Sequence, residues 1–124
     1  MILGIGTDIV EIERIEIAMK RHGVRFVRRI LTDMEYDVFT AHHQPGHFLA
    51  KRFAAKEAVV KALGTGFSQG INLHAIEVSN TKFGRPAVEL KAGALTAYHT
   101  MGASNIHLSL SDEKAYALAF VVIS

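Results

Sequence analysis

The chain has 124 residues, of which 49% are hydrophobic and 21% charged, a composition that fits one globular domain over residues 1–124. It contains no cysteine, which excludes disulfide bonds, cysteine-ligated zinc and thiol catalysis. The formal net charge of +2 is too small to indicate a nucleic-acid-binding protein, and suits an anionic small molecule or an acidic protein partner. The N-terminus lacks the pattern of a signal peptide, and the longest apolar run, residues 115–123, is too short to span a bilayer. We therefore expect a cytoplasmic protein that binds neither nucleic acid nor membrane.

The first predicted element is a strand over residues 2–10, where β-branched residues are frequent and two glycines disfavour a helix. Asp8 lies inside this apolar segment. A carboxylate there is either a helix cap or turn contact or a metal ligand, and the sequence alone leaves both open.

A first helix is predicted to begin between residues 11 and 13 and to end at Gly23, with acidic residues at its start and basic residues at its end. Arg14, Arg21 and Arg25 belong to a basic surface on and after this helix. Such a surface is either a solvated face or a docking surface for an acidic protein. Downstream, Thr32 and Glu35 have the spacing of a capping box, which predicts a short helix.

Residues 42–47 contain three histidines and are predicted to form a turn. His43 and His47 are four positions apart, as two zinc ligands on a helix would be. Pro45 and Gly46 lie between them and interrupt the helix that would bring them to one face, which disfavours a zinc site.

The stretch around which the chain is organised is a predicted helix over residues 48–63, ended by Gly64. Small or apolar residues surround it almost completely, so we expect it to be largely buried. It nevertheless carries Lys56, Glu57 and Lys61, and buried charges are costly unless they are paired or bound to a ligand. Glu57 and Lys61 have the spacing of an intrahelical salt bridge. The alternative is that Glu57 holds a metal and Lys61 a phosphate.

After a glycine-rich loop at residues 64–70, the sequence predicts a hairpin of strands 75–79 and 87–90, a helix over 92–101, and strands over 106–111 and 115–123. The last strand is almost continuously apolar, which predicts burial on both faces. His107 lies on the polar face of the preceding strand, either as a hydrogen-bonded residue or as a catalytic or phosphate-contacting one. These elements together predict an α+β fold in which a small, mainly antiparallel sheet packs against the long central helix.

Two carboxylates in apolar surroundings, Asp8 and Glu57, are the usual means of holding Mg²⁺ against phosphates, and Lys61 would offset charge on a departing phosphate. The residues alone therefore favour metal-assisted chemistry on a phosphate group. The competing hypotheses are a basic nucleic-acid-binding module, which lacks a recognisable motif, and a purely structural interaction domain.

Two long motifs and two short ones resemble a known family. Residues 4–15 resemble the N-terminal signature of the holo-[acyl-carrier-protein] synthases, the small stand-alone class of 4′-phosphopantetheinyl transferases. Residues 53–66 resemble the second signature of that family, with its Lys-Glu-Ala core and Gly-Thr-Gly end, and residues 84–86 and 107–111 match weaker motifs. One departure is Asp112, where many relatives have a histidine.

The resemblance implies the family's fold and a homotrimer with sites at subunit interfaces. It also implies transfer of the 4′-phosphopantetheine arm from coenzyme A to a serine of apo acyl carrier protein, which releases adenosine 3′,5′-bisphosphate and supports fatty acid biosynthesis. Asp8 and Glu57 would bind Mg²⁺, and Lys61 and His107 would act at the phosphates. The residues implied at the coenzyme A site are Arg52, Lys61, Gly64, Thr65, Gly66, Arg85 and Pro86, and those implied to dock the carrier protein are Arg14, Arg21 and Arg25. The general base stays open between a metal-bound water, Glu57 and another carboxylate.

Overall fold

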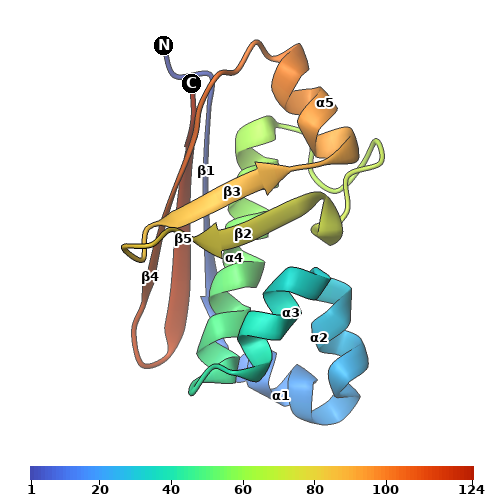
Figure 1. The fold of residues 1–124 in the computed structure, drawn as a ribbon, viewed down its shortest axis with the longest axis vertical. Helices are drawn as coiled ribbons and strands as arrows, with labels where there is room; N and C mark the ends of the chain where they lie inside the picture. The colour runs from blue at the N-terminus through green and yellow to red at the C-terminus, as the bar shows by residue number, and fades with distance from the viewer.

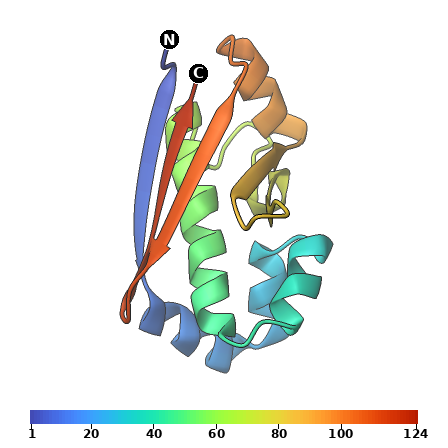
Figure 2. The ribbon, with the colours of Figure 1, turned by 60° about the vertical axis from the view of Figure 1, so that its left-hand side comes forward.

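The computed structural model describes residues 1–124, which form an α+β fold in layers around one helix. Helix α4 (Pro45–Leu63) lies between a three-stranded sheet on one side and a hairpin and further helices on the other (Figures 1 and 2). The sheet has the order β1-β5-β4 and is antiparallel throughout, with β1 (Gly4–Glu11), β5 (Tyr116–Ile123) and β4 (Ile106–Asp112). The predicted fold class is therefore confirmed.

The other layer is made of short elements. The strands β2 (Ile76–Asn80) and β3 (Pro86–Leu90) form the predicted hairpin. Helices α1 (Ile12–His22), α2 (Val24–Ile30) and α3 (Asp33–Thr40) gather at the end of α4 where it begins, and α5 (Ala92–Thr100) lies near its other end (Figure 1). A short 3-10 helix, η1 (Leu73–Ala75), precedes β2. None of the helices is both long and apolar enough to cross a lipid bilayer.

Helix α4 begins three residues earlier than predicted, at Pro45. Proline is tolerated at the first helical position, where its missing N–H has no partner to lose, so Pro45 starts the helix and does not interrupt it. The helix ends at Gly64 as predicted, with the glycine in the left-handed conformation at φ 76°. Thirteen of its 19 residues are buried, which confirms the expectation of a buried helix.

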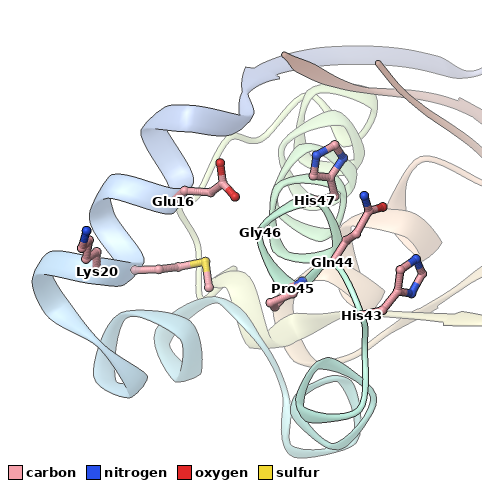
Figure 3. A pocket seen from close by; sticks show the side chains of 8 residues that line it. Glu16, Lys20, His43, Gln44, Pro45, Gly46 and His47 are labelled. Atoms are coloured by element: carbon pink, nitrogen blue, oxygen red, sulfur yellow. The ribbon is translucent and has the colours of Figure 1, made fainter. Parts of the chain in front are cut away.

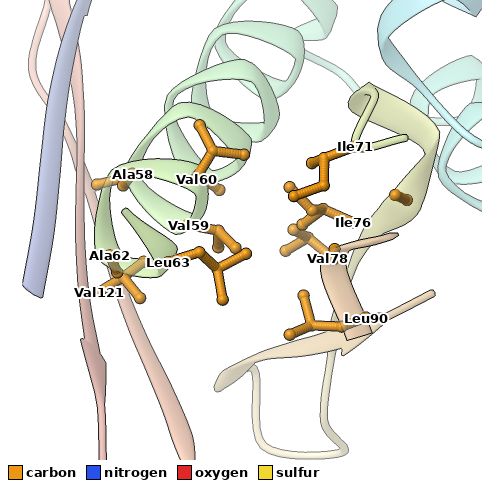
Figure 4. Close-up of a cluster of buried hydrophobic side chains, with 14 of the residues drawn as sticks. Ala58, Val59, Val60, Ala62, Leu63, Ile71, Ile76, Val78, Leu90 and Val121 are labelled. Atoms are coloured by element: carbon orange, nitrogen blue, oxygen red, sulfur yellow. The ribbon is translucent and has the colours of Figure 1, made fainter. Parts of the chain in front are cut away.

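The two sides of α4 pack differently. Large side chains of α4, among them Val59 and Leu63, meet Ile76 and Leu90 of the hairpin in the main hydrophobic cluster (Figure 4). On the sheet side the residues are small. A methyl group at Gly6 would overlap the carbonyl oxygen of Ala58, and one at Gly4 would overlap that of Ala62. The glycines of the first motif therefore let β1 approach the backbone of α4 closely.

The local predictions for the elements before α4 hold. Helix α1 ends at Gly23, and the Thr32–Glu35 capping box is formed, with Thr32 N donating to Glu35 Oε1 at 2.8 Å and Glu35 N donating to Thr32 Oγ1 at 3.3 Å. The short helix α2 was not predicted, because the basic residues in it conceal its apolar face of Val27 and Ile30.

The prediction that the last strand is buried on both faces is wrong. Its inward residues are buried, but Tyr116, Leu118 and Phe120 are 47%, 39% and 44% exposed, because no layer of this chain covers the outer face of the sheet. Ile5 and Ile9 of β1 share that face and are 61% and 62% exposed. The outer face of the β1-β5-β4 sheet is therefore an apolar surface.

Candidate active site

Asp8 and Glu57 are brought to one cavity. Asp8 lies on the same face of β1 as Gly4 and Gly6, which is the face that packs closely against α4, and Glu57 projects from α4. Both line a cavity of about 350 Å³, which Arg14 of α1 also lines. The close approach of strand and helix thus places two carboxylates side by side.

Lys61 pairs with Asp8 and not with Glu57. Its Nζ donates to Asp8 Oδ1 at 3.1 Å and to the carbonyl oxygen of Thr7 at 2.9 Å. The intrahelical Glu57–Lys61 salt bridge, one of the two alternatives that the sequence left open, is not formed. The Lys61 side chain is 53% exposed, so its ammonium group is accessible to a ligand.

Glu57 is in an unfavourable electrostatic position. Its pKa is raised, first by burial and then by the negative charge of Asp8, while Lys61 opposes the rise. The two carboxylates therefore repel each other, and a cation between them would relieve that repulsion. No group of three or more histidine or carboxylate side chains in the chain is arranged to hold a metal ion. Two carboxylate donors fit Mg²⁺, which completes its coordination with water and phosphate oxygens.

A second cavity, of about 490 Å³, meets the first at Glu57. Arg29 of α2 and Leu73 and His74 of η1 line it, and Phe67 and Ile71 make part of it apolar. Glu57 therefore lies between two hollows.

The residues expected at a coenzyme A site fall into separate groups. Arg52 and Pro86 line a cavity of about 300 Å³ together with Lys51. Arg52 is 4% exposed; its Nη2 donates to Asn80 Oδ1 at 2.8 Å, and its Nε is buried with no hydrogen-bond partner. Burial lowers the pKa of this guanidinium, with Glu35 opposing the change. A buried, unpartnered donor at a basic cavity is suited to an anion.

Gly64, Thr65 and Gly66 lie at the other end of α4. Gly64 follows Arg52 by 12 residues, about 18 Å of helix, and Thr65 lines a different cavity, beside α5. Arg85 is exposed in the turn between β2 and β3. One chain therefore does not bring the predicted coenzyme A residues together.

His107 is also separated from the carboxylates. It pairs with Val122 in the register of β4 and β5 and is exposed on the outer face of the sheet, whereas Asp8 is on the inner face. Arg14, Arg21 and Arg25 are all exposed, as a docking surface requires, and Arg14 is the one that lines the carboxylate cavity.

The largest hollow, about 590 Å³, contains none of the predicted site residues (Figure 3). It lies between α1 and the start of α4. The carboxylate of Glu16 reaches towards Gly46 there, while His43 and His47 come from the turn and the first turn of α4. His47 is engaged elsewhere, with its Nδ1 2.9 Å from Asp112 Oδ2.

These features agree with what the chain resembles. Residues 4–121 match the family model of the 4′-phosphopantetheinyl transferase superfamily. The chain belongs to that superfamily. It is 53% identical over 123 residues to the holo-[acyl-carrier-protein] synthase of Vibrio cholerae serotype O1, covering 99% of this chain and 98% of the relative. It is 49% identical over 122 residues to the enzyme of that name from Escherichia coli O157:H7, covering 98% and 97%.

Solved structures agree. The crystal structure of holo-[acyl-carrier-protein] synthase from Neisseria meningitidis superposes with a TM-score of 0.91 at 42% identity, covering 100% of this chain and 99% of that one. The Bacillus anthracis synthase in complex with coenzyme A (3′,5′-ADP) gives 0.83 at 38% identity, covering 99% and 96%. The resemblance seen in the sequence motifs is therefore confirmed.

Sequence reasoning left without a role three residues that line the cavities of this structure or bond to residues that line them. Arg29 was given no role from the sequence, and the periodicity of the unpredicted helix α2 was the signal that could have placed it. Asp112 was left without a role; it binds His47 and, at 3.3 Å, Lys51, and the hydrogen bond from His47 lowers its pKa. Lys56 was unexplained, although a lysine in an otherwise apolar helix itself indicates a buried acidic partner.

Proposed function

We propose that this chain, acting as one domain over residues 1–124, transfers 4′-phosphopantetheine from coenzyme A to a serine of apo acyl carrier protein. The products are holo acyl carrier protein and adenosine 3′,5′-bisphosphate, and the reaction supports fatty acid biosynthesis in the cytoplasm. The observation that carries the proposal is the meeting of Asp8 and Glu57 at one cavity, with Lys61 bonded to Asp8, in a chain that belongs to this superfamily.

The chain's own residues have distinct parts in this reaction. Asp8 and Glu57 hold Mg²⁺, which when bound reduces the negative charge of the pyrophosphate that a nucleophile must approach. Lys61 exchanges its bond to Asp8 for a phosphate oxygen, and its Nζ donates a hydrogen bond to the leaving phosphate. The attacking serine comes from the carrier protein, so the chain needs no nucleophile of its own. Arg14, Arg21 and Arg25 dock the acidic carrier.

Coenzyme A binds at Lys61 and the 64–66 loop, with Arg52, Arg85 and Pro86 completing the site. We propose that these groups and His107 meet across subunits of a homotrimer. Two observations support this: the groups are separated within one chain, and the outer sheet face next to His107 exposes apolar residues such as Ile5 and Phe120. A second copy of the chain would cover such a face. Light scattering after gel filtration tests this by comparing the mass in solution with the chain mass of 13.6 kDa.

The transfer itself is tested by mass spectrometry. The protein is incubated with coenzyme A, Mg²⁺ and apo acyl carrier protein, and the carrier is weighed before and after. We expect one phosphopantetheine adduct per carrier and none when coenzyme A is omitted. A carrier whose mass does not change under saturating substrates would overturn the proposed function.

A further inference from the structure

Lys56 is a fully buried lysine whose hydrogen-bonding capacity is used completely. Its side chain is 0% exposed, and its Nζ donates to Glu35 Oε1 at 2.6 Å, to the carbonyl oxygen of Ile30 at 2.7 Å and to that of Leu73 at 3.0 Å. An ammonium group has three protons, so none is left over. Burial lowers the pKa of Lys56, and the charge of Glu35 opposes that change.

Glu35 is satisfied equally well. Its Oε1 also accepts the backbone N–H of Thr32 at 2.8 Å, and its Oε2 accepts that of Val78 at 2.7 Å. The capping box of α3 and the buried ion pair therefore share one carboxylate. Through it, α4 is bonded to α3 and β2.

Two of the three acceptors of Lys56 belong to segments that form walls of the second cavity, the one of about 490 Å³ that Glu57 lines. Ile30 follows Arg29, which forms one wall, and Leu73 forms another with His74. Lys56 precedes Glu57 on α4, which is the third wall, and does not itself line the cavity. His74 Nε2 lies 2.7 Å from the carbonyl oxygen of Arg28, which joins the first two walls independently.

A buried ion pair is a poor source of stability, because the cost of removing two charges from water offsets their attraction. What it provides is geometry: charge-assisted bonds of fixed length and direction hold their elements more specifically than apolar contacts do. We propose that Lys56 is a positioning residue that fixes the walls of this cavity around Glu57 and so sets the orientation of the Glu57 carboxylate towards a cation at Asp8. This inference rests on the proposed function of Glu57 as a metal ligand.

The test is the double variant Lys56→Met/Glu35→Gln, which removes both charges while keeping similar side-chain volumes. Replacing both members of a buried pair is far better tolerated than removing one, so we expect cooperative thermal unfolding. Calorimetry with Mn²⁺ as the probe cation should give a Kd weakened about tenfold, the usual effect of losing the groups that orient a metal ligand. We expect kcat to fall about tenfold, with KM for coenzyme A changing less than about twofold.

The matched control is Lys91→Met. Lys91 also bonds a shielded carboxylate, that of Glu77 at 3.2 Å, and Glu77 in turn accepts a hydrogen bond from the Thr32 hydroxyl group. Lys91 does not line the cavity, and its Nζ bonds Glu77 and none of the cavity's lining residues, so its variant should keep the wild-type Kd and kcat. A loss of Mn²⁺ affinity in Lys91→Met equal to that of the double variant would overturn the proposal, since it would indicate a general loosening of the fold.

If the double variant does not unfold cooperatively, Lys56→Gln/Glu35→Gln takes its place, because it also removes both charges and keeps an amide donor at position 56 for the buried carbonyl oxygens. A folded variant whose Mn²⁺ Kd and kcat equal those of the wild type would overturn the role of Lys56. The same measurements on the wild-type chain test the proposed function separately from the role of Lys56. A wild-type chain that does not bind Mn²⁺ or does not modify the carrier would overturn that function, whatever the variants do.

Discussion

Two lysines five residues apart on α4 occupy opposite electrostatic environments. Lys56 faces α2, α3 and η1, is 0% exposed, and has all three of its N–H donors bonded. Lys61 faces β1, is 53% exposed, and bonds Asp8 beside a second carboxylate, Glu57. The pKa of Glu57 is raised by burial first and by repulsion from Asp8 second, and Lys61 does not cancel the rise. The difference shows that a charged side chain on a buried helix holds neighbouring elements in place where all its hydrogen bonds are made within the protein. Where repulsion remains beside a cavity, a ligand has something to gain by binding.

The largest loss of stability is expected when Lys56 is replaced. Lys56→Met leaves the Glu35 carboxylate buried without its cation, which should cost about 3–5 kcal/mol of unfolding free energy in urea titrations. Lys61→Met removes a pair whose lysine is 53% exposed and should cost less than about 1 kcal/mol. Equal losses for the two variants would show that the two environments are not as different as their exposure indicates.

Asp8→Ala should do the reverse and affect activity more than stability. Removing one of two carboxylates from the cavity should lower the rate of carrier modification about a hundredfold or more, with the unfolding free energy changed by less than about 1 kcal/mol. The control is Asp33→Ala, which removes a 98% exposed carboxylate paired with Arg28. An Asp8→Ala chain that modifies the carrier at the wild-type rate under saturating Mg²⁺ would remove Asp8 from the site.

Gly6→Ala probes the contact that brings the two carboxylates together. Its methyl group would overlap the carbonyl oxygen of Ala58, so β1 must move away from α4 at a cost of about 1–3 kcal/mol. We expect a drop in melting temperature and a loss of activity, since Asp8 moves with the strand. Thr7→Ala, on the outer face of β1, should change neither by a comparable amount. Wild-type stability in Gly6→Ala would indicate a looser contact than the one described.

Arg14→Glu tests whether Arg14, which lines the cavity of Asp8 and Glu57, docks the acyl carrier protein. We expect KM for the acyl carrier protein to rise about tenfold through charge repulsion, while KM for coenzyme A stays within about twofold. Lys114→Glu makes the same charge change in the exposed turn before β5 and is the control. Similar losses for both substrates would argue against a docking function for Arg14.

The smallest effect concerns Glu57 and pH. Because its folded pKa is raised, this carboxyl group contributes stability below its unfolded value of 4.5, and that contribution is lost as the pH rises through the folded pKa. Glu57→Gln removes the repulsion from Asp8. It should therefore be more stable than the wild type at pH 7 by roughly 0.5 kcal/mol, a small effect because solvent screens the group, with the advantage disappearing near pH 4. A thermal unfolding series across this range measures it, and a less stable variant at pH 7 would contradict the assigned repulsion.

The sequence predicts what depends on neighbours along the chain. The end of α4 at Gly64, the Thr32–Glu35 box and the β2–β3 hairpin each follow from residues within a few positions of one another, and all three are present. Asp8 and Glu57 were also grouped from the sequence, as two carboxylates in apolar segments and by the family motifs, and the structure brings both to one cavity.

What the sequence could not predict depends on distant partners. Spacing along a helix offers Lys61 only Glu57, whereas the acid it finds lies 53 residues away in β1. Lys56 finds Glu35 at a separation of 21 residues. The exposed face of β5 was not predicted for a related reason. An apolar run indicates that both faces of a strand are covered, but it does not say whether the cover comes from the same chain.

The burial of Lys56 has one more consequence. Reagents that acylate lysine amines reach the exposed lysines of the folded chain directly, but the Lys56 amine is 0% exposed and bonded on every side. It becomes reactive only when α4 separates from α2, α3 and η1, an event that breaks the core. The rate at which Lys56 is labelled would therefore measure how often the whole molecule opens, so that this amine is a chemical reporter of unfolding.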